Sequence, residues 1–293
     1  MERGKKLRDL KQQMVSLLES FGIERGEARV ESELIVEHVS GMNRAQQLVC
    51  ADIPLTDKQI SKIEVHLLRR EERMPIQYSL QTTDFCGLKF KVRQGVFIPR
   101  DDTEILVEHT LKLSKEFEDK EVIRMLEVGV GSGCISISLL KRNPKLLAVA
   151  TDISEEALSL TLENAKRHQI LPRLALKNEG LWWVLDDKFD LIVSNPPYIP
   201  ENEKENLDPE VVEYEPHEAL FGKDPDGLRF YRKLSETAMK LFGPAGGYIV
   251  LEVGDGQADK VVEIFRENGW TSIKREKDMN GIYRVVSALW RKI

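Results

Sequence analysis

The sequence predicts an α/β protein whose mostly parallel sheet is covered by helices on both faces, preceded by a small helical domain. From residue 122 onward, short apolar runs typical of buried strands alternate with segments whose apolar residues recur every three or four positions. Before about residue 76 only the helical period occurs. Strand–helix alternation implies parallel strands, and ligands bind at the edge where the carboxyl ends of such strands meet.

Residues 1–76 are expected to form the helical domain, which recognises a partner. Apolar residues at helical spacing predict helices over 7–21 and 28–39, each followed by a glycine that suits a helix end. A third helix is predicted over 57–73, because Thr56 and the glutamine three residues later match a capping box. The proline at position 75 ends it.

Residues 77–101 are expected to link the two domains. Alternating apolar residues broken by two glycines predict a β-hairpin over 83–98. A helix is then predicted over 104–115, with Thr103 or Asp102 as its N-terminal cap.

Residues 102–293 hold the predicted sheet and its covering helices. Strands are expected over 122–128, 146–151, 173–177, 189–194, 247–253, 271–275 and 283–290. Helices are expected over 134–142, 155–168, 228–241 and 258–268, and a long irregular segment over 200–227. The last two strands are expected to pair with each other.

A glycine-rich turn, Glu127-Val-Gly-Val-Gly-Ser-Gly133, joins the first of these strands to its helix. Its three glycines can adopt positive φ and let a ligand approach the backbone closely. Asp152 ends the next strand, where a carboxylate can accept both hydroxyl hydrogens of a ribose. A tight turn without a ligand would explain the glycines but not Asp152. Two cofactor classes use this geometry.

The spacing favours S-adenosylmethionine over a dinucleotide. A dinucleotide fingerprint has glycine at its first, third and sixth positions, and the sixth position here is Cys134. The third glycine instead takes the fifth position. Glu127 stands two residues before the first glycine, where its carboxylate would repel a pyrophosphate and could meet the amino group of a methionine moiety.

Asn195-Pro-Pro-Tyr198 follows the apolar run that ends at Ser194. The prolines fix φ and remove two backbone donors, and Asn195 is held extended because it precedes a proline. The side-chain carbonyl of Asn195 and the backbone carbonyl of Pro196 could accept the two hydrogens of a planar NH2 group. The ring of Tyr198 could lie against the flat face of that group. A proline-rich turn that merely closes a buried strand is the alternative.

Bulk properties exclude several classes of function. The net charge of −6 counts against a clamp on duplex DNA, which usually carries a basic surface. The three cysteines are far apart, which indicates a reducing cytoplasm and neither disulfides nor a metal site. The charged N-terminus has no apolar stretch behind it, so no signal peptide is expected, and no apolar run is long enough to span a membrane.

The glycine turn, Asp152 and Asn195-Pro-Pro-Tyr198 together resemble class I methyltransferases that act on NH2 groups of planar systems. Further segments resemble the release-factor glutamine methyltransferase family (HemK/PrmC-like), nearly from end to end. These segments are Pro75-Ile-Gln-Tyr78, Phe85-Cys-Gly-Leu-Lys-Phe90, Val96-Phe-Ile-Pro-Arg-Asp-Asp-Thr-Glu104, Ala219-Leu-Phe-Gly-Lys-Asp-Pro-Asp-Gly-Leu-Arg-Phe-Tyr-Arg232 and Asp278-Met-Asn-Gly-Ile-Tyr-Arg284.

The resemblance implies a class I methyltransferase fold, Rossmann-like with a mostly parallel seven-stranded sheet. It implies transfer of a methyl group from S-adenosylmethionine, leaving S-adenosylhomocysteine, to N5 of the glutamine in the Gly-Gly-Gln motif of bacterial peptide chain release factors. We expect a monomer that contacts neither nucleic acid nor a membrane. The expected cofactor-binding residues are Glu127, Gly129, Val130, Gly131, Ser132, Gly133, Asp152, Leu181, Trp182 and Asn195. The expected substrate-binding residues are Asn195, Pro196, Pro197 and Tyr198, of which Asn195, Pro196 and Tyr198 are catalytic.

The chain departs from the family pattern in three places. Asp101 stands where the family more often has proline, and Lys223 stands where it often has glycine. After the third strand the family has an aspartate and then an apolar or aromatic residue beside the adenine, whereas this chain reads Asn178-Glu-Gly-Leu-Trp-Trp183, so that either Leu181 or Trp182 takes that position. Other functions stay open at this point: methylation of a ribosomal-protein glutamine, methylation of an exocyclic amino group of nucleic acid, or non-enzymatic dinucleotide binding.

Overall fold

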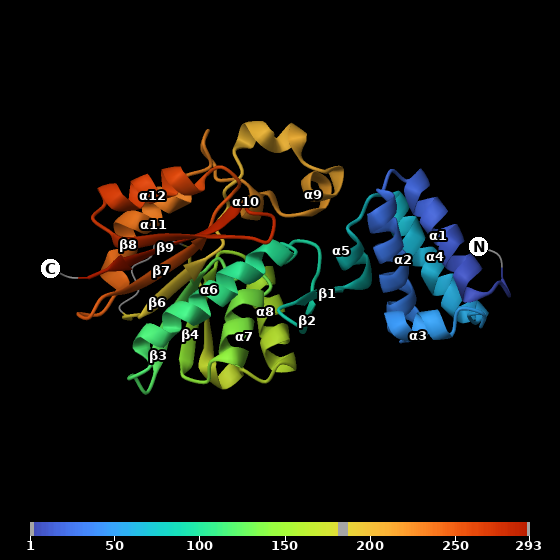
Figure 1. The fold of residues 1–293 in the computed structure, drawn as a ribbon, viewed down its shortest axis with the longest axis horizontal. Helices are drawn as coiled ribbons and strands as arrows, with labels where there is room; N and C mark the ends of the chain where they lie inside the picture. The colour runs from blue at the N-terminus through green and yellow to red at the C-terminus, as the bar shows by residue number, and fades with distance from the viewer. Residues whose placement is uncertain (1–2, 181–186, 292–293) are drawn as a thin grey trace. The chain divides into compact units, whose positions relative to one another are not determined.

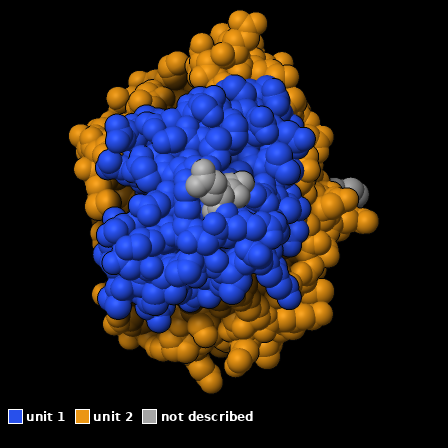
Figure 2. Space-filling model, turned by 90° about the vertical axis from the view of Figure 1, so that its right-hand side faces the viewer, with its two compact units in different colours: residues 1–82, 208–214 blue, residues 83–207, 215–293 orange. Residues whose placement is uncertain are grey.

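The computed structural model describes residues 3–180 and 187–291, and they form two compact units. Residues 1–82 and 208–214 make up the first, called here the helical unit, and residues 83–207 and 215–293 make up the second, the sheet unit (Figure 2). Leu181 and Trp182, both expected to contact the cofactor, lie outside the described residues. Division of the chain at residues 76 and 101 stays a prediction.

Helices make up the helical unit (Figure 1). They are α1 (Leu7–Ser20), α2 (Arg25–Ser40), α3 (Arg44–Val49), α4 (Asp57–Glu71), α5 (Ile76–Leu80) and α9 (Pro209–Tyr214). The three helices expected from periodicity are α1, α2 and α4, and the capping box at Thr56 is present. Helix α3 was not expected, although Asn43 and Gln46 form a capping box at its start. Leu10, Ile35 and Ile60, all fully buried, belong to the apolar core of this unit.

Seven strands form the central sheet of the sheet unit, and each lies within two residues of its expected position. They are β3 (Ile123–Val128), β4 (Leu146–Asp152), β5 (Leu174–Asn178), β6 (Leu191–Ser194), β7 (Gly247–Glu252), β8 (Thr271–Lys277) and β9 (Tyr283–Trp290). Their order is β5-β4-β3-β6-β7-β9-β8. The first five in that order are parallel, whereas β9 runs antiparallel to both β7 and β8. The mostly parallel seven-stranded sheet is therefore confirmed.

Helices cover both faces of this sheet, as the alternation predicted (Figure 1). They are α6 (Glu104–Ser114), α7 (Cys134–Arg142), α8 (Glu155–Arg167), α11 (Arg229–Thr237) and α12 (Ala258–Glu267), whereas the short α10 (His217–Leu220) lies near the carboxyl ends of the parallel strands. Adjacent strand residues enter different cores: Met125 packs with α6, α7 and α8, and its neighbour Leu126 packs with α11 and α12. This alternation follows from the period of two along a strand.

The strand order reverses between β3 and β6. The chain passes from β3 outward to β4 and β5, then returns to β6 on the other side of β3 and continues to β7. Ligands of open α/β sheets bind in the crevice outside such a switch point. The glycine-rich turn directly follows β3 and Asn195 directly follows β6, so both lie at this crevice.

Two local expectations were only partly right. The hairpin is shorter than residues 83–98, because its strands are β1 (Thr82–Phe85) and β2 (Leu88–Lys91). The irregular segment 200–227 contains the short helices α9 and α10. Among the described residues, no helix combines the length and hydropathy that crossing a membrane requires.

The expected side-chain cap of α6 is wrong. Thr103 does occupy the N-cap position, but its side chain makes no capping hydrogen bond. Its backbone is already helical, with φ −69° and ψ −18°, because a 3₁₀ turn over Asp101–Thr103 leads into the helix. Asp102 is paired with Arg284 instead, at 2.9 Å. The hydroxyl of Thr103 is used at the site described next.

Candidate functional site

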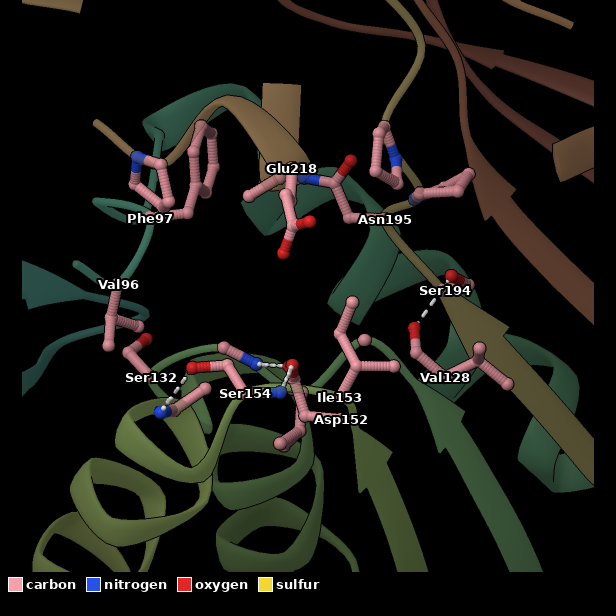
Figure 3. A pocket seen from close by; sticks show the side chains of 18 of the residues that line it. Val96, Phe97, Val128, Ser132, Asp152, Ile153, Ser154, Ser194, Asn195 and Glu218 are labelled. Carbon is pink, nitrogen blue, oxygen red and sulfur yellow. Dashed lines mark hydrogen bonds between the residues drawn. The ribbon is translucent and has the colours of Figure 1, made fainter. Parts of the chain in front are cut away.

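A cavity of about 390 Å³ opens at the carboxyl ends of the parallel strands in the sheet unit. Its described lining includes residues 128–132 after β3, 152–154 after β4 and 194–199 after β6. Residues 95–97, Pro216 and residues 218–220 complete much of the remaining wall (Figure 3). The cavity therefore joins the glycine-rich turn, Asp152 and the Asn-Pro-Pro-Tyr segment, as the sequence predicted.

The three glycines of the turn have positive φ: +77° at Gly129, +55° at Gly131 and +82° at Gly133. A Cβ built on Gly129 or Gly131 would have no heavy atom within 4 Å, so these positions leave open space for a ligand. A Cβ on Gly133 would lie 2.8 Å from Cγ2 of Thr161, so this glycine instead permits close packing of α7 against α8. Val130 and Ser132 also line the cavity.

Asp152 is held by backbone donors on both sides (Figure 3). The N–H of Gly131 donates to its Oδ2 at 2.9 Å, and the N–H of Ser154 donates to its Oδ1 at 3.0 Å. A carboxylate has about four acceptor sites, so each oxygen can still accept a further hydrogen bond. Asp152 lines the cavity and is therefore placed to accept hydroxyl hydrogens from a bound ribose.

Two side chains on α8 support the turn, and the sequence analysis did not find them. Thr161 donates to the carbonyl of Gly131 at 2.9 Å. Asn164 donates to the carbonyl of Ser132 at 2.9 Å. Both are fully buried on the face of α8 that also buries Leu160. Polar residues within an otherwise apolar helix stripe were the signal that could have identified them, because buried polar groups need partners.

Glu127 lies behind the turn and is not among the residues that line the cavity. Its carboxyl accepts hydrogen bonds from the backbone N–H of Ser136, at 3.0 Å, and from the Ser136 hydroxyl. Complete burial raises its pKa to about 8, although the Ser136 bonds act in the opposite direction. Its Oε1 is buried and has no hydrogen-bond partner among the described residues. The N-terminal turn of α7 is thus occupied by an acidic side chain, which disfavours a phosphate there.

The side chain of Asn195 is oriented by Thr103, a residue of the segment 96–104. Nδ2 of Asn195 donates to Oγ1 of Thr103 at 3.3 Å. Asn195 is partly exposed and lines the cavity, and none of the described residues donates a hydrogen bond to its Oδ1. The hydroxyl of Ser194 fixes the preceding backbone by donating to the carbonyl of Val128 at 2.7 Å (Figure 3). The amide oxygen of Asn195 is therefore available to a ligand.

Pro196, Pro197 and Tyr198, which follow Asn195 in sequence, also line the cavity. The hydroxyl of Tyr198 donates to Oε1 of Glu252 at 3.4 Å, and burial raises the pKa of this phenol. The side chain of Gln257 donates to the backbone carbonyl of Tyr198 at 2.9 Å. The ring is thus held in place at the cavity wall, and its predicted contact with a substrate NH2 group stays a prediction.

The segment 96–104 is held by an ion pair between a buried glutamate and a partly exposed arginine. Glu215, 1% exposed at its side chain, forms an ion pair with Arg100 and accepts a hydrogen bond from the backbone N–H of Ile98 at 3.3 Å. The guanidinium of Arg100 lies 4.9 Å from the centre of the Phe97 ring. These contacts join the segment 96–104 to the segment that begins at Pro216.

The charge of the lining favours a cationic ligand. Among the described lining residues the carboxyl side chains are those of Asp152, Glu156, Glu179 and Glu218, and the same lining has no lysine, arginine or histidine. A pyrophosphate would meet only carboxylates there, whereas a sulfonium or ammonium group would be attracted. Open space at the glycines, a ribose acceptor at Asp152 and an unpartnered carboxyl oxygen at Glu127 fit S-adenosylmethionine.

Comparison with known proteins gives concordant matches. A family model described as PrmC N-terminal domain matches residues 9–80, and one described as Methyltransferase small domain matches residues 87–214. A protein of Geobacter sulfurreducens named release factor glutamine methyltransferase is 41% identical over 260 residues, which is 88% of each chain. One of the same name from Flavobacterium psychrophilum is 35% identical and covers 88% of this chain and 90% of its own. A methyltransferase structure from Pyrococcus furiosus shares the fold, with a TM-score of 0.51 and 19% identity over 79% of this chain and 100% of that one.

Proposed function

We propose that this protein, which belongs to the release factor glutamine methyltransferase family, methylates N5 of the glutamine in the Gly-Gly-Gln motif of bacterial peptide chain release factors. The observation that carries the proposal is the pairing of Asn195 with Thr103, which leaves an amide oxygen available in an acidic cavity. Such an oxygen suits an NH2 group, and the acidic lining suits a cationic methyl donor.

S-adenosylmethionine is the proposed cofactor, and when bound it supplies an electrophilic methyl group. We assign Gly129, Gly131 and Asp152 to its binding, with Val130 and Ser132 at the same turn and Gly133 beneath it. Glu127 does not line the cavity, so we assign it to cofactor binding through its buried Oε1, which has no hydrogen-bond partner among the described residues. The contribution of Leu181 and Trp182 to cofactor binding stays a prediction.

The chain's own residues must make a poor nucleophile reactive. The lone pair of an amide nitrogen is shared with its carbonyl, so the nitrogen has to pyramidalise as the new bond forms. Positive charge then develops on the nitrogen and makes its hydrogens better donors. Acceptors at Asn195 Oδ1 and at the carbonyl of Pro196 therefore stabilise the transition state more than the ground state.

No general base is required before the new bond forms. The nitrogen becomes acidic once it carries the additional methyl group, and its proton can then leave to solvent. The described lining offers Glu218 and other carboxylates for that proton. The ring of Tyr198 and the two prolines are assigned to positioning, since alignment of the reacting atoms supplies much of the remaining rate enhancement.

The proposed protein substrate places the activity in the cytoplasm, and we propose that the enzyme acts as a monomer without direct nucleic-acid or membrane contacts. The net charge of −6 and the acidic cavity lining support a protein substrate over nucleic acid. Methylation of a ribosomal-protein glutamine is the nearest alternative, because the same amide chemistry would serve it.

The proposed function is tested by incubating the protein and S-adenosylmethionine with a full-length release factor, ribosomal proteins or duplex DNA in parallel reactions. Mass spectrometry then locates any added methyl group. We expect one methyl group on the glutamine of the Gly-Gly-Gln peptide. If only ribosomal protein or only DNA were methylated, with cofactor binding verified by calorimetry, the substrate would be that ribosomal protein or DNA and not a release factor.

A further inference from the structure

The Asn-Pro-Pro-Tyr segment is held at both ends and is stiff between them. At its start, the hydroxyl of Ser194 donates to the carbonyl of Val128 at 2.7 Å (Figure 3). At its end, the backbone carbonyl of Tyr198 accepts a hydrogen bond from Nε2 of Gln257 at 2.9 Å. The two prolines between these ends fix φ but leave rotation about ψ free, so the anchor at Tyr198 limits how their carbonyls can turn.

The side chain of Gln257 has a matching partner at each end of its amide. Its Oε1 accepts the backbone N–H of Gly254 at 3.1 Å, and its Nε2 donates to the carbonyl of Tyr198 and, at 3.4 Å, to that of Asp226. Turning the amide over would place Oε1 against two carbonyls and Nε2 against an N–H group, so only one orientation fits. The donor toward Tyr198 is thus selected by backbone groups, none of which changes protonation near neutral pH.

Gln257 begins α12 but does not cap it. It occupies the N-cap position of that helix, where shorter polar residues are preferred, and makes no capping hydrogen bond. A carboxylate at this place would have no hydrogen for the two carbonyls, and an ammonium or guanidinium group would have no acceptor for the N–H of Gly254. The amide of Gln257 is therefore used toward Tyr198 and Asp226 and not for the helix that it begins.

Two glycines allow the surrounding chain to close on Tyr198. A Cβ on Gly227, whose φ is +68°, would lie 2.0 Å from the carbonyl oxygen of Tyr198. A Cβ on Gly254 would lie 3.0 Å from Cδ2 of the Tyr198 ring. Gly227 therefore admits the carbonyl that Gln257 binds, and Gly254 admits the ring. This crowding is a second, independent sign that the position of Tyr198 is fixed.

Gln257 also joins two segments of the cavity wall. The carbonyl of Asp226 belongs to the segment 216–227, part of which lines the cavity as the Asn-Pro-Pro-Tyr segment does. The same two segments are joined by their backbones, because the N–H of Ile199 donates to the carbonyl of Leu220 at 3.0 Å. One side-chain amide thus completes the connection between them.

We propose that Gln257 is a positioning residue, which holds the carbonyl of Tyr198 and thereby aligns the ring of Tyr198 and the carbonyl of Pro196 with the substrate amide. This inference rests on the proposed function. Gln257 is not among the described residues that line the cavity, so it acts through Tyr198 and not on a ligand. Its effect therefore falls on the alignment of the reacting atoms, on which the rate depends steeply.

The test compares Gln257→Glu with the wild type at about pH 8, where a glutamate side chain is ionised. The glutamate has nearly the same shape but no donor for the two carbonyls. The values of kcat and of KM for a full-length release factor are measured at saturating S-adenosylmethionine, and calorimetry gives the affinity for the cofactor. We expect kcat to fall about 10- to 100-fold, with KM and the cofactor Kd within about threefold of the wild type.

Asn268→Asp is the matched control, since it makes the same chemical change at the other end of α12. Asn268 is partly buried like Gln257, and its Nδ2 donates to the hydroxyl of Ser235 at 3.1 Å and to the carbonyl of Ile264 at 2.9 Å. We expect Asn268→Asp to lower stability in urea unfolding and to leave kcat unchanged. Equal loss of kcat in Asn268→Asp and Gln257→Glu would show that the loss follows from the stability of α12, and would overturn the proposal.

Gln257→Met removes both hydrogen-bonding groups without adding a charge, and it decides the question if Gln257→Glu does not fold. We expect kcat to fall about tenfold or more, again with KM and cofactor affinity retained. A cofactor Kd raised as much as kcat is lowered would indicate a general disturbance of the cavity and would overturn the positioning role.

Failure of this inference is distinguishable from failure of the proposed function. Wild-type kcat in Gln257→Glu or Gln257→Met, with the wild type methylating the Gly-Gly-Gln glutamine, would overturn the role of Gln257 and leave the proposed function intact. A wild type that binds S-adenosylmethionine but adds no methyl group to the release factor would overturn the proposed function, and this role with it.

Discussion

At the residue scale, Asp152 is held in place by two backbone donors beside the cofactor cavity. Its carboxylate accepts hydrogen bonds from the backbone N–H of Gly131 and from that of Ser154. Replacing Asp152 by alanine should therefore weaken binding of S-adenosylmethionine by about 1.5–3 kcal/mol, the range for hydrogen bonds to charged groups. Calorimetry measures this loss. Asp259→Ala, which removes one exposed carboxylate on α12, controls for the change in net charge. Unchanged affinity in Asp152→Ala would remove this residue from the site.

Glu127 makes stability depend on pH in a predictable direction. Burial raises its pKa to about 8 from an ordinary value of 4.5, so the folded protein retains a proton that the unfolded chain has released. The stabilising contribution of Glu127 is therefore complete below pH 4.5 and is lost as the pH rises through about 8. From this group alone the free energy of unfolding falls by up to about 1.4 kcal/mol per pH unit in that window.

Glu127→Gln should remove this part of the pH dependence. Urea unfolding of the wild type and the variant, measured across the same window, gives the slopes to compare. Glu118→Gln, which changes an exposed glutamate, is expected to keep the wild-type slope. An unchanged slope in Glu127→Gln would mean that this carboxyl is already ionised at neutral pH in the folded protein.

At the scale of elements, the glycines of the turn differ in what they do. Gly131 and Gly133 both have positive φ, but only at Gly133 would a Cβ approach another side chain, Thr161, to 2.8 Å. Gly133→Ala should be less stable than Gly131→Ala by about 1–3 kcal/mol, the cost of overpacking. Denaturant unfolding of the two variants tests this difference. Equal losses would show that α8 yields freely at this contact.

The sequence could predict the strands and the glycine turn because their signals are local. Periodicity located β3 through β9 to within two residues, and the glycine spacing placed the turn. The role of Thr103 could not be predicted in this way. Its partner Asn195 is 92 positions away, and the local pattern before α6 indicated a cap. A polar side chain has several possible partners, and only tertiary structure selects among them.

At the scale of the whole molecule, residues 208–214 belong to the helical unit although residues 83–207 separate them from the rest of it in sequence. Arg70 on α4 is fully buried and forms ion pairs with Glu31 on α2 and Glu210 on α9, each at 2.9 Å. Burial raises the pKa of Glu31 to about 7, although Arg70 acts in the opposite direction. Arg70 and Glu210 are 140 positions apart, so no sequence pattern indicated their pairing.

Arg70→Leu should destabilise the helical unit by about 3–5 kcal/mol, because it leaves the buried carboxyl of Glu31 without its partner, whereas Glu210 keeps its ion pair with Arg73. Arg44→Leu is the control, since Arg44 is 80% exposed at its side chain and its ion pair with Glu33 should contribute less than about 1 kcal/mol. Denaturant unfolding measures both changes, and hydrogen exchange shows whether residues 208–214 lose protection together with α2 and α4. A loss below about 1 kcal/mol in Arg70→Leu would mean that the network contributes little.

The most direct test of the account is the rate at which Asn195→Ala methylates a full-length release factor at saturating S-adenosylmethionine. The account predicts that kcat falls about 10²- to 10³-fold, as for loss of one preorganised transition-state hydrogen bond, while the methyl group still appears only on the Gly-Gly-Gln glutamine. A variant that turns over at nearly the wild-type rate would contradict the claim that the amide oxygen of Asn195 activates the substrate.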